Sequence, residues 1–262
     1  KGLLMDINAA ESRVGDAITT LKNSRGIEGR FIAQDAPLSV VLKKQRIAFE
    51  FDGNQRFDSN FGLPETMEGN SPYSIAAWIM NPNLSEAECI LDVNQAGGEL
   101  EKIVFGYGKD SNSGIISHHA GYEDMGLQDI SGNQEWIHLV ATYDGFKERI
   151  YINGNMVKEK DILLRLPLSE KLFIGKDFAG ERPYTGWLSS LSLYDIPLSS
   201  LEVSTLYKKE TSCNVLFAFQ PSMLPYESIS WQNEGVWRGQ ANSIVDNAIL
   251  DVEGKIVIGK EL

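Results

Sequence analysis

Short runs of strand-forming residues, separated by turn residues, dominate the hydrophobic pattern of the chain. The clearest run is WIHLVATY at 136–143, and the shorter run RIYI follows at 149–152. Both are rich in the β-branched and aromatic residues that favour strands. Asp144-Gly145 separates the two runs and Asn153-Gly154 follows the second; these are preferred hairpin turns, because Gly and Asn accept a positive φ at low cost. The pattern predicts a three-stranded antiparallel meander over residues 136–160.

The same pattern recurs on both sides of this meander. Further strands are predicted at 3–7, 17–21, 29–33, 46–51, 73–80, 101–107, 171–175 and 186–196. One helix is predicted after Pro197, in SSLEVSTLYKKE, where Ser199 or Ser200 can cap the first turn. About a dozen short strands with one short helix indicate an all-β fold. We therefore expect a two-layer antiparallel β-sandwich, in which each sheet buries one face against the other.

The two ends of the chain share a pattern. Residues 2–51 and 214–259 each contain a leading apolar strand, a second strand that ends in Asn plus Gly, and a closing Ile-x-Phe or Ile-x-Ile strand. We predict a sandwich domain over 1–212 and a C-terminal β extension over 213–262. If the shared pattern is a true repeat, the extension is the start of a second, similar unit. Chance similarity between two β-rich segments is the alternative. Because the chain begins at Lys1 rather than at an initiator Met, we also expect a piece of a longer protein.

Composition and charge narrow the class of partner. Hydrophobic residues make up 42% of the chain and charged residues 23%, a mixture that can bury a globular core. Asp and Glu number 36 against 24 Lys and Arg, for a net charge of −12. Such a chain suits neither a nucleic-acid backbone nor an anionic membrane, and no apolar run approaches the roughly 18 residues of a membrane-spanning helix. Cys89 and Cys213 are too few for a disulfide framework or a cysteine zinc site.

Several motifs, in a fixed order, resemble the laminin G-like, concanavalin A-like domain family. They are FEFDGNQRF (49–57), YSIAAWI (73–79), EWIHLVATYDGFKERIYINGNMV (135–157) and LFIGKDFAGERPYTGWLSSLSLYDIPLSSLEV (172–203). The resemblance covers about residues 2–208. It implies a jelly-roll sandwich and, usually, non-catalytic binding of glycans or proteins outside the cytoplasm. It leaves the ligand open, because this fold serves many functions.

A catalytic role would require a particular pattern of carboxylates. Glycan hydrolases with this sandwich carry a Glu-x-Asp-x-Glu run, which places two carboxylates on one face of a strand as nucleophile and acid. The chain contains no such run: Glu99 and Glu101 alternate without an Asp between them, and Glu123 and Asp124 are adjacent. Neither Gly-x-Ser-x-Gly nor His-Glu-x-x-His occurs. The sequence therefore favours a protein that is not an enzyme, and the enzyme question stays open.

Residues with the chemistry of a sugar-binding site gather around the polar segment ISHHAGYED at 116–124. Such a site needs a flat ring for stacking and planar groups for hydrogen bonds. The candidate ligand-binding residues with these properties are Tyr107, His119, Tyr122 and Asp124 and, across the sandwich, Arg182 and Tyr184. An exposed polar loop without a ligand is the alternative.

Four other residues with large rings are interpreted as structural. Trp78, Trp136 and Trp187 each begin or centre a predicted strand, and large apolar rings in strands usually pack in a core. His138 lies between Ile137 and Leu139 in a predicted strand and is explained by its strand position.

The resemblance also implies calcium, because many relatives hold Ca²⁺ at the edge of the sandwich with six to eight oxygens. The candidate ligands, all at or near predicted strand ends, are Asp6, Asp52, Gly53 and Asp195. Pentraxin relatives use two loops that correspond to 91–99 and 175–181. These loops offer Asp92, Asn94, Gln95 and Asp177, but Lys176 stands where that pattern needs an acid or amide. A double site is not expected, and a single structural Ca²⁺ is the hypothesis.

Three hypotheses about function follow. The first is a non-catalytic carbohydrate-binding or adhesion module in an extracellular, periplasmic or cell-surface location. Its partners would be a glycan or glycoprotein and the adjacent domains of a larger surface protein or polysaccharide-degrading enzyme, with no nucleic acid and no membrane insertion. The second is a glycoside hydrolase or lyase with an unfamiliar carboxylate pair. The third is a structural spacer or protein-interaction domain, which would expose an apolar patch where a neighbour docks.

Overall fold

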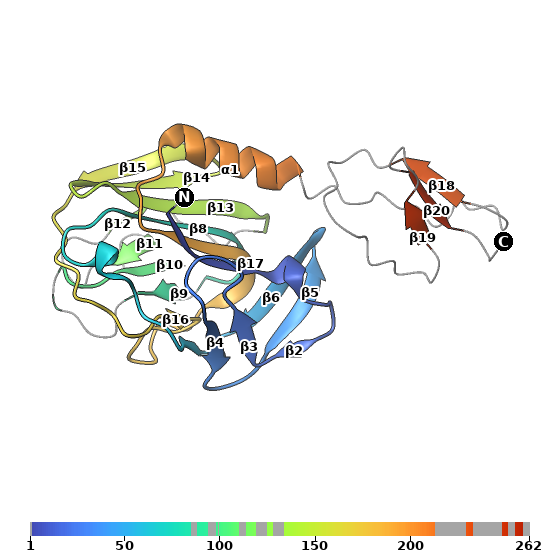
Figure 1. Ribbon diagram of the computed structural model, residues 1–262, viewed down its shortest axis with the longest axis horizontal. Helices are drawn as coiled ribbons and strands as arrows, with labels where there is room; N and C mark the ends of the chain where they lie inside the picture. The colour runs from blue at the N-terminus through green and yellow to red at the C-terminus, as the bar shows by residue number, and fades with distance from the viewer. Residues whose placement is uncertain are drawn as a thin grey trace. The chain divides into compact units, whose positions relative to one another are not determined.

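Two antiparallel sheets packed face to face form the first of two units in the chain (Figure 1). The computed structural model describes residues 2–84, 88–93, 98, 100–109, 114–118, 125–127, 134–212, 229–232, 248–250 and 255–258. The two units are Lys1–Thr205 and Leu206–Leu262, whereas the sequence pattern placed the division after residue 212. The predicted all-β, two-layer architecture is confirmed.

The two sheets of the first unit are named sheet A and sheet B. In the described residues, sheet A has the order β15 (Asn155–Asp161), β14 (Lys147–Ile152), β13 (Ile137–Tyr143), β8 (Tyr73–Met80), β17 (Thr185–Tyr194), β6 (Arg46–Asp52), β5 (Leu38–Lys43) and β2 (Ala17–Ile18), and β1 (Leu3–Asn8) also pairs with β17. Sheet B has the order β12 (Met125–Leu127), β11 (Gly114–His118), β10 (Val104–Lys109), β9 (Cys89–Asp92), β16 (Phe173–Ile174), β7 (Phe57–Ser59), β4 (Arg30–Ala33) and β3 (Thr20–Lys22).

The remaining elements are few. Two short 3₁₀ helices, η1 (Ala9–Glu11) and η2 (Glu65–Met67), lie in connections of the first unit. The helix α1 (Ser200–Ser212) follows β17. In the second unit, the described residues form a separate small antiparallel sheet of β18 (Ile229–Gln232), β20 (Lys255–Ile258) and β19 (Ala248–Leu250).

The predicted meander is confirmed as β13, β14 and β15. Leu139 of β13 faces Ile152 of β14, and Ile152 faces Asn155 of β15. Asn153 and Gly154, which join β14 to β15, have φ values of 50° and 80°. Both turn residues therefore take the left-handed conformation that a tight hairpin requires, and Asn and Gly adopt it with little strain.

The predicted helix is also confirmed, and Ser199 is its cap. The Ser199 Oγ accepts a hydrogen bond from the backbone N–H of Glu202 at 3.3 Å, and the Glu202 carboxylate accepts one from the Ser199 N–H at 2.8 Å. This reciprocal pair is a capping box, which satisfies two backbone donors that the first turn leaves without helical partners.

The strand β17 pairs with three others at the centre of sheet A. The strand β8 pairs along one edge of β17. Along the other edge, β6 pairs with residues 185–188 and β1 pairs with residues 190–194. The register with β8 shifts between Leu188 and Ser190, which makes Ser189 the extra residue of a β-bulge. The bulge reverses the alternation of side chains, so that Leu188 and Leu191 both belong to the core. Trp187, the neighbour of Leu188, therefore lies on the opposite face of sheet A.

Both sheets contribute fully buried side chains to one core between them. Those of sheet A include Ile75, Leu139 and Leu191, and those of sheet B include Phe31, Leu91 and Phe105. Burial of this apolar surface is the main favourable contribution to folding.

A core truncation tests this arrangement. Leu191→Ala is expected to lower the free energy of unfolding by about 2–5 kcal/mol, because it leaves a cavity beside the bulge. Leu201→Ala, in a side chain that is 77% exposed, is the matched control and should change stability by less than about 0.5 kcal/mol. Guanidinium unfolding measures both. Equal effects would contradict the placement of Leu191 in the core.

Candidate functional site

The predicted sugar-binding residues do not form one surface in the described part of the chain. Tyr184 is fully buried, with its ring centroid 5.3 Å from that of Phe51 and its hydroxyl donating to the Trp187 carbonyl at 3.2 Å. Tyr107 is 6% exposed, and burial raises the pKa of both phenols. Both rings pack in the core and offer no face to a ligand, which corrects the proposed role of these two tyrosines. His119, Tyr122 and Asp124 lie outside the described residues.

Arg182, the remaining candidate, belongs to a group of charges around two buried carboxylates at the end of β9, an interior strand of sheet B. Its Nη1 lies 3.5 Å from Asp177 Oδ2. The Lys102 Nζ lies 3.6 Å from Asp92 Oδ2 and 3.8 Å from Asp177 Oδ2. Both carboxylates are almost completely buried, and each also accepts a backbone N–H, from Phe178 at 2.9 Å and from Glu181 at 2.8 Å. The group fastens the loop 175–181 to the end of β9.

The ion pairs of Asp92 and Asp177 are evidence on the calcium hypothesis. Asp92 and Asp177, from the two loops that a pentraxin-like site would use, do come together. The cations of Lys102 and Arg182 lie against their carboxylates, however, and buried carboxylates that already have cationic partners are poor ligands for an added ion. Asn94 and Gln95 lie outside the described residues.

Two of the candidate calcium ligands, Asp52 and Asp195, lie too far apart to share an ion. Asp52 pairs with Thr185 at one end of β17, and Asp195 follows the other end, which separates them by about 30 Å for a strand of that length. Asp52, with Gly53 after it, therefore cannot share an ion with Asp195. Asp6 accepts a hydrogen bond from Ser192 at 3.2 Å, and burial raises its pKa. The described residues contain no group of three or more His, Cys, Asp or Glu that could hold a metal.

Three tryptophans that the sequence pattern assigned to the core lie on the opposite face of sheet A. Trp78 pairs with His138 and with Ser190, and Trp187 pairs with Glu50 and with Met80. The core side of the same strands carries other residues, such as Ile79 and Phe49. The prediction of buried rings holds for Trp78, which is 3% exposed, but not for Trp136 and Trp187, which are only half-buried. We call this surface, formed by Trp78, Trp136, Trp187, His138, Arg46, Lys43 and Glu50, the tryptophan face.

Two cations lie directly over the rings of the tryptophan face. The Arg46 Cζ is 3.7 Å from the ring centroid of Trp78 and 5.8 Å from that of Trp136. The Lys43 Nζ is 3.9 Å from the ring centroid of Trp187. These are cation–π contacts, in which the negative face of the ring attracts the charge.

The indole N–H groups point to defined acceptors. Trp187 Nε1 donates to the Glu50 carboxylate at 3.1 Å, and Trp136 Nε1 donates to the Lys43 carbonyl at 3.0 Å. Trp136 and Trp187 are half-buried, as are Lys43 and Glu50, whereas Trp78 is buried beneath Arg46. The arrangement presents two partly exposed rings with a carboxylate acceptor and an ammonium donor beside them.

His138 contributes a neutral ring to the same face. Its centroid lies 5.2 Å from that of Trp78 at an interplanar angle of 34°, and its backbone N–H donates to Asn153 Oδ1 at 2.9 Å. Burial, with a smaller contribution from the positive charge of Arg46, lowers the pKa of His138 to about 4. The ring is therefore uncharged at neutral pH, and the positive charge of this face comes from Arg46 and Lys43.

Known proteins resemble the chain in sequence. Residues 52–204 match the family described as the concanavalin A-like lectin/glucanases superfamily. Botulinum neurotoxin type E from Clostridium butyricum is 27% identical over 177 residues, which cover 59% of this chain and 14% of the toxin. The corresponding toxin from Clostridium botulinum is 26% identical over 167 residues, covering 60% of this chain and 12% of the toxin. The chain thus spans a small part of the length of these relatives.

Solved structures share the fold. Domain 4 of AbnA, a GH43 extracellular arabinanase from Geobacillus stearothermophilus solved with arabinotriose, matches with a TM-score of 0.57 and 14% identity, over 78% of this chain and 98% of that domain. The binding domain of Paraclostridial Mosquitocidal Protein 1 matches with a TM-score of 0.59 and 17% identity, over 82% of this chain and 54% of that one. Within the described residues, no helix has the length and apolar character needed to cross a membrane.

The pKa of His138 predicts how stability depends on pH. The folded protein holds the neutral ring down to about pH 4, whereas the unfolded chain protonates near the ordinary value of 6.5. The stabilising contribution is therefore complete above pH 6.5 and is lost as the pH falls toward 4. Between about pH 7.5 and pH 4.5, this residue should account for a loss of about 2–3 kcal/mol.

His138→Gln removes the titration and isolates this contribution. Urea unfolding of both proteins at the two pH values should show a smaller loss in the variant by that amount. Other titrating groups act in both proteins and cancel in the comparison. Parallel pH profiles would contradict the burial of a neutral His138.

Proposed function

The chain belongs to the concanavalin A-like lectin/glucanase superfamily, and from this premise we propose that it is a non-catalytic carbohydrate-binding module whose ligand lies on the tryptophan face. The observation that carries the proposal is the pair of half-exposed rings, Trp136 and Trp187. Indole rings offer a flat apolar surface to the C–H groups of a sugar. Glu50 and Lys43, which contact Trp187, supply an acceptor and a donor for sugar hydroxyls.

The structural neighbours support binding as the role. Domain 4 of the arabinanase is described as a complex with arabinotriose, and binding domains of botulinum neurotoxins are described as complexes with SialylT and with rat synaptotagmin II. For this chain we propose a glycan or glycoprotein partner, with the sugar unspecified. We also propose an extracellular, periplasmic or cell-surface location, a choice that the extracellular arabinanase supports.

The described carboxylates favour binding over hydrolysis. A glycosidase needs two carboxyl groups about 5–10 Å apart that both reach the substrate. Asp92 and Asp177 share the Lys102 ammonium, but both are buried and committed to holding a loop. On the tryptophan face, Glu50 accepts the indole N–H of Trp187, and no second carboxylate of the described residues belongs to that face.

An exposed apolar patch outside the tryptophan face favours the protein-interaction hypothesis. Phe146 and Leu163 are each 56% exposed, and both line a shallow hollow with Leu100 and Ile162. Exposed apolar side chains that gather in one place are typical of docking surfaces. This patch serves as the control surface in the following experiment.

Substitution of a ring tests the proposal directly. The purified chain is screened on an array of plant, bacterial and animal glycans, and its best ligand is titrated calorimetrically. Trp187→Ala should weaken binding at least about tenfold, because the loss of a stacking ring removes about 1.4 kcal/mol or more. Trp136→Ala should act in the same direction.

The matched control is Phe146→Ala, which removes an exposed aromatic ring outside the tryptophan face and should leave the affinity unchanged. Circular dichroism verifies that each variant keeps its fold. If the array gives no ligand, or if Phe146→Ala rather than Trp187→Ala abolishes binding, the carbohydrate proposal fails and the docking surface becomes the leading candidate.

Chelation separates this proposal from a calcium-dependent lectin. Because rings and direct hydrogen bonds hold the ligand on the tryptophan face, we expect the affinity to be the same in 1 mM Ca²⁺ and in EDTA, to within about twofold. A structural Ca²⁺ would instead appear as a change of melting temperature. Loss of binding in EDTA would argue against the tryptophan face and direct mutagenesis to Asp6, Asp52 and Asp195.

A further inference from the structure

The exposed apolar side chains next to the turn between β13 and β14 surround a hollow of about 310 Å³. Leu100, Phe146 and Leu163 line it together with Ile162, and Asp161 is the one charged side chain among the described residues that line it. Phe146 and Leu163 are each 56% exposed, and Leu100 is half-buried. These side chains therefore offer apolar surface to a ligand. We call this feature the apolar hollow.

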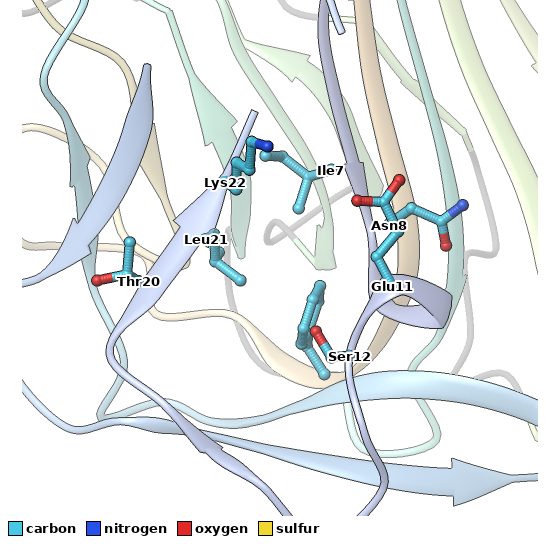
Figure 2. A pocket seen from close by; sticks show the side chains of 8 residues that line it. Ile7, Asn8, Glu11, Ser12, Thr20, Leu21 and Lys22 are labelled. Atoms are coloured by element: carbon cyan, nitrogen blue, oxygen red, sulfur yellow. The ribbon is translucent and has the colours of Figure 1, made fainter. Parts of the chain in front are cut away.

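A second hollow differs in this respect. Figure 2 shows it between β3 and η1, where Leu21, Glu11 and Ser12 are among the residues that line it. Its apolar side chains, Ile7, Leu21 and Phe49, belong to the core and are at most 3% exposed. It presents no apolar surface, so the apolar hollow is the better candidate for a binding site.

Hydrogen bonds hold Phe146 at the wall of the apolar hollow. The Asp144 carboxylate accepts the backbone N–H of Phe146 at 3.0 Å and that of Lys147 at 2.7 Å. The Phe146 carbonyl accepts the N–H of Ile162 at 2.9 Å, which places the segment of Leu163 beside the turn. The exposed ring therefore stands on a backbone that is already fixed before any ligand binds.

The outward position of Leu163 follows from the register of its segment. Ile162, Leu164 and Leu166 are buried in the core, whereas Leu163 and Arg165 between them are exposed. This is the alternation of an extended chain, in which successive side chains point to opposite sides. Leu163 thus occupies a solvent position that a polar residue would suit as well, and a large apolar side chain there points to a binding role.

The third wall contains a strained residue. Leu100 has a φ of 66°, in the left-handed region that residues with a side chain rarely adopt. Its carbonyl accepts the N–H of Arg165 at 2.8 Å, and the N–H of Glu101 donates to the Gly98 carbonyl at 3.1 Å. These bonds hold the turn that directs Leu100 to the hollow. Strain of this kind persists where the surrounding structure imposes it, and it concentrates at binding sites.

The charges next to the apolar hollow are negative in sum. The Lys147 Nζ lies 3.1 Å from Glu159 Oε1 and 3.4 Å from Asp161 Oδ1. The Arg149 guanidinium lies 2.7 Å from Asp144 Oδ2 and 3.5 Å from Glu159 Oε2. Three carboxylates therefore share two cations. The Asp161 side chain, at the hollow itself, is 60% exposed and can accept a further cation.

We propose that the apolar hollow binds a leucine, isoleucine or phenylalanine side chain of a protein partner, carried on a segment that also contains lysine or arginine. The volume lies at the lower end of the roughly 300–1,000 Å³ of ligand sites, which suits one large side chain with its adjacent backbone. The apolar walls supply the anchor, and the carboxylates beside it attract the cation. The site is separate from the tryptophan face and does not depend on the carbohydrate proposal.

The charge of the chain distinguishes this occupant from a second copy. Two copies with a net charge of −12 each repel one another. A basic segment is attracted both by the whole chain and by Asp161. A heterologous basic partner is therefore favoured over a symmetric dimer through the apolar hollow.

Phage display of random peptides of about 12 residues tests the proposal, because a short segment can fill a site of this size. The full chain is the bait, and a chain with both Phe146→Ser and Leu163→Ser removes peptides that bind elsewhere. The enriched peptides should contain leucine, isoleucine or phenylalanine beside lysine or arginine. The most enriched peptide is then synthesised, and its Kd, measured calorimetrically, should be on the order of 1–100 μM.

Single substitutions locate the binding of that peptide. Leu163→Ser should weaken it at least about tenfold, because it removes an apolar wall. Asp161→Asn should weaken it about threefold or more and reduce the dependence of the Kd on salt. Leu42→Ser is the matched control, at a leucine of β5 that is 61% exposed and lies outside the hollow, and it should leave the Kd unchanged. Thermal melts verify that each variant is folded.

Two cross-measurements keep this proposal distinct from the carbohydrate site. Trp187→Ala should leave the affinity for the peptide unchanged, and Leu163→Ser should leave the affinity for a glycan unchanged. No enrichment over the double variant, enrichment of peptides without basic residues, or equal affinities of Leu163→Ser and Leu42→Ser would each overturn the proposal. A dimer in sedimentation velocity that Leu163→Ser dissociates would also overturn it, because a second copy would then occupy the hollow.

Discussion

The register of β17 is the constraint on which the rest of the first unit depends. This strand joins β8 on one edge to β6 and β1 on the other, and the extra residue Ser189 sets the phase of its side chains. The Ser189 hydroxyl donates to the Ile47 carbonyl at 2.9 Å, which anchors the bulge to the neighbouring strand. Because a shift of one residue exchanges the two faces of a strand, the bulge puts Leu188 and Leu191 in the core together and leaves Trp187 on the other side.

A second set of buried polar contacts connects the start of β17 to sheet B. The Glu88 carboxylate, almost completely buried, accepts the side-chain amide of Asn81 at 2.6 Å and both the N–H and hydroxyl of Thr185 at 2.7 and 2.9 Å. A buried carboxylate is tolerated when hydrogen bonds replace its lost water. Glu88 thus holds the start of β17 beside the start of β9, and Asp92 and Asp177 hold the loop 175–181 at the other end of β9.

Much of this fold could be predicted from the sequence, because its signals are local. Features that depend on the pairing of distant strands could not be predicted. The meander follows from Asn153-Gly154, and the helix start follows from Ser199 and Glu202, because each signal lies within a few residues of its effect. Trp187 was assigned to the core because nothing in WLSSLSL marks Ser189 as a bulge; strict alternation would place Trp187 with Leu191. Tyr184 was misjudged for the same reason, since its burial depends on Phe51, far away in the chain.

The geometry of the tryptophan face also sets the scale of its affinity. The Lys43 ammonium already lies over Trp187, a contact worth about 0.5–1 kcal/mol at a partly exposed site. A sugar that stacks on the same face of Trp187 displaces the ammonium, so this ring contributes only the difference between the two contacts. A ligand that also reaches Trp136 gains a second contact at the effective concentration that the first contact sets. Strength in such a module therefore comes from contacts that are linked along the ligand.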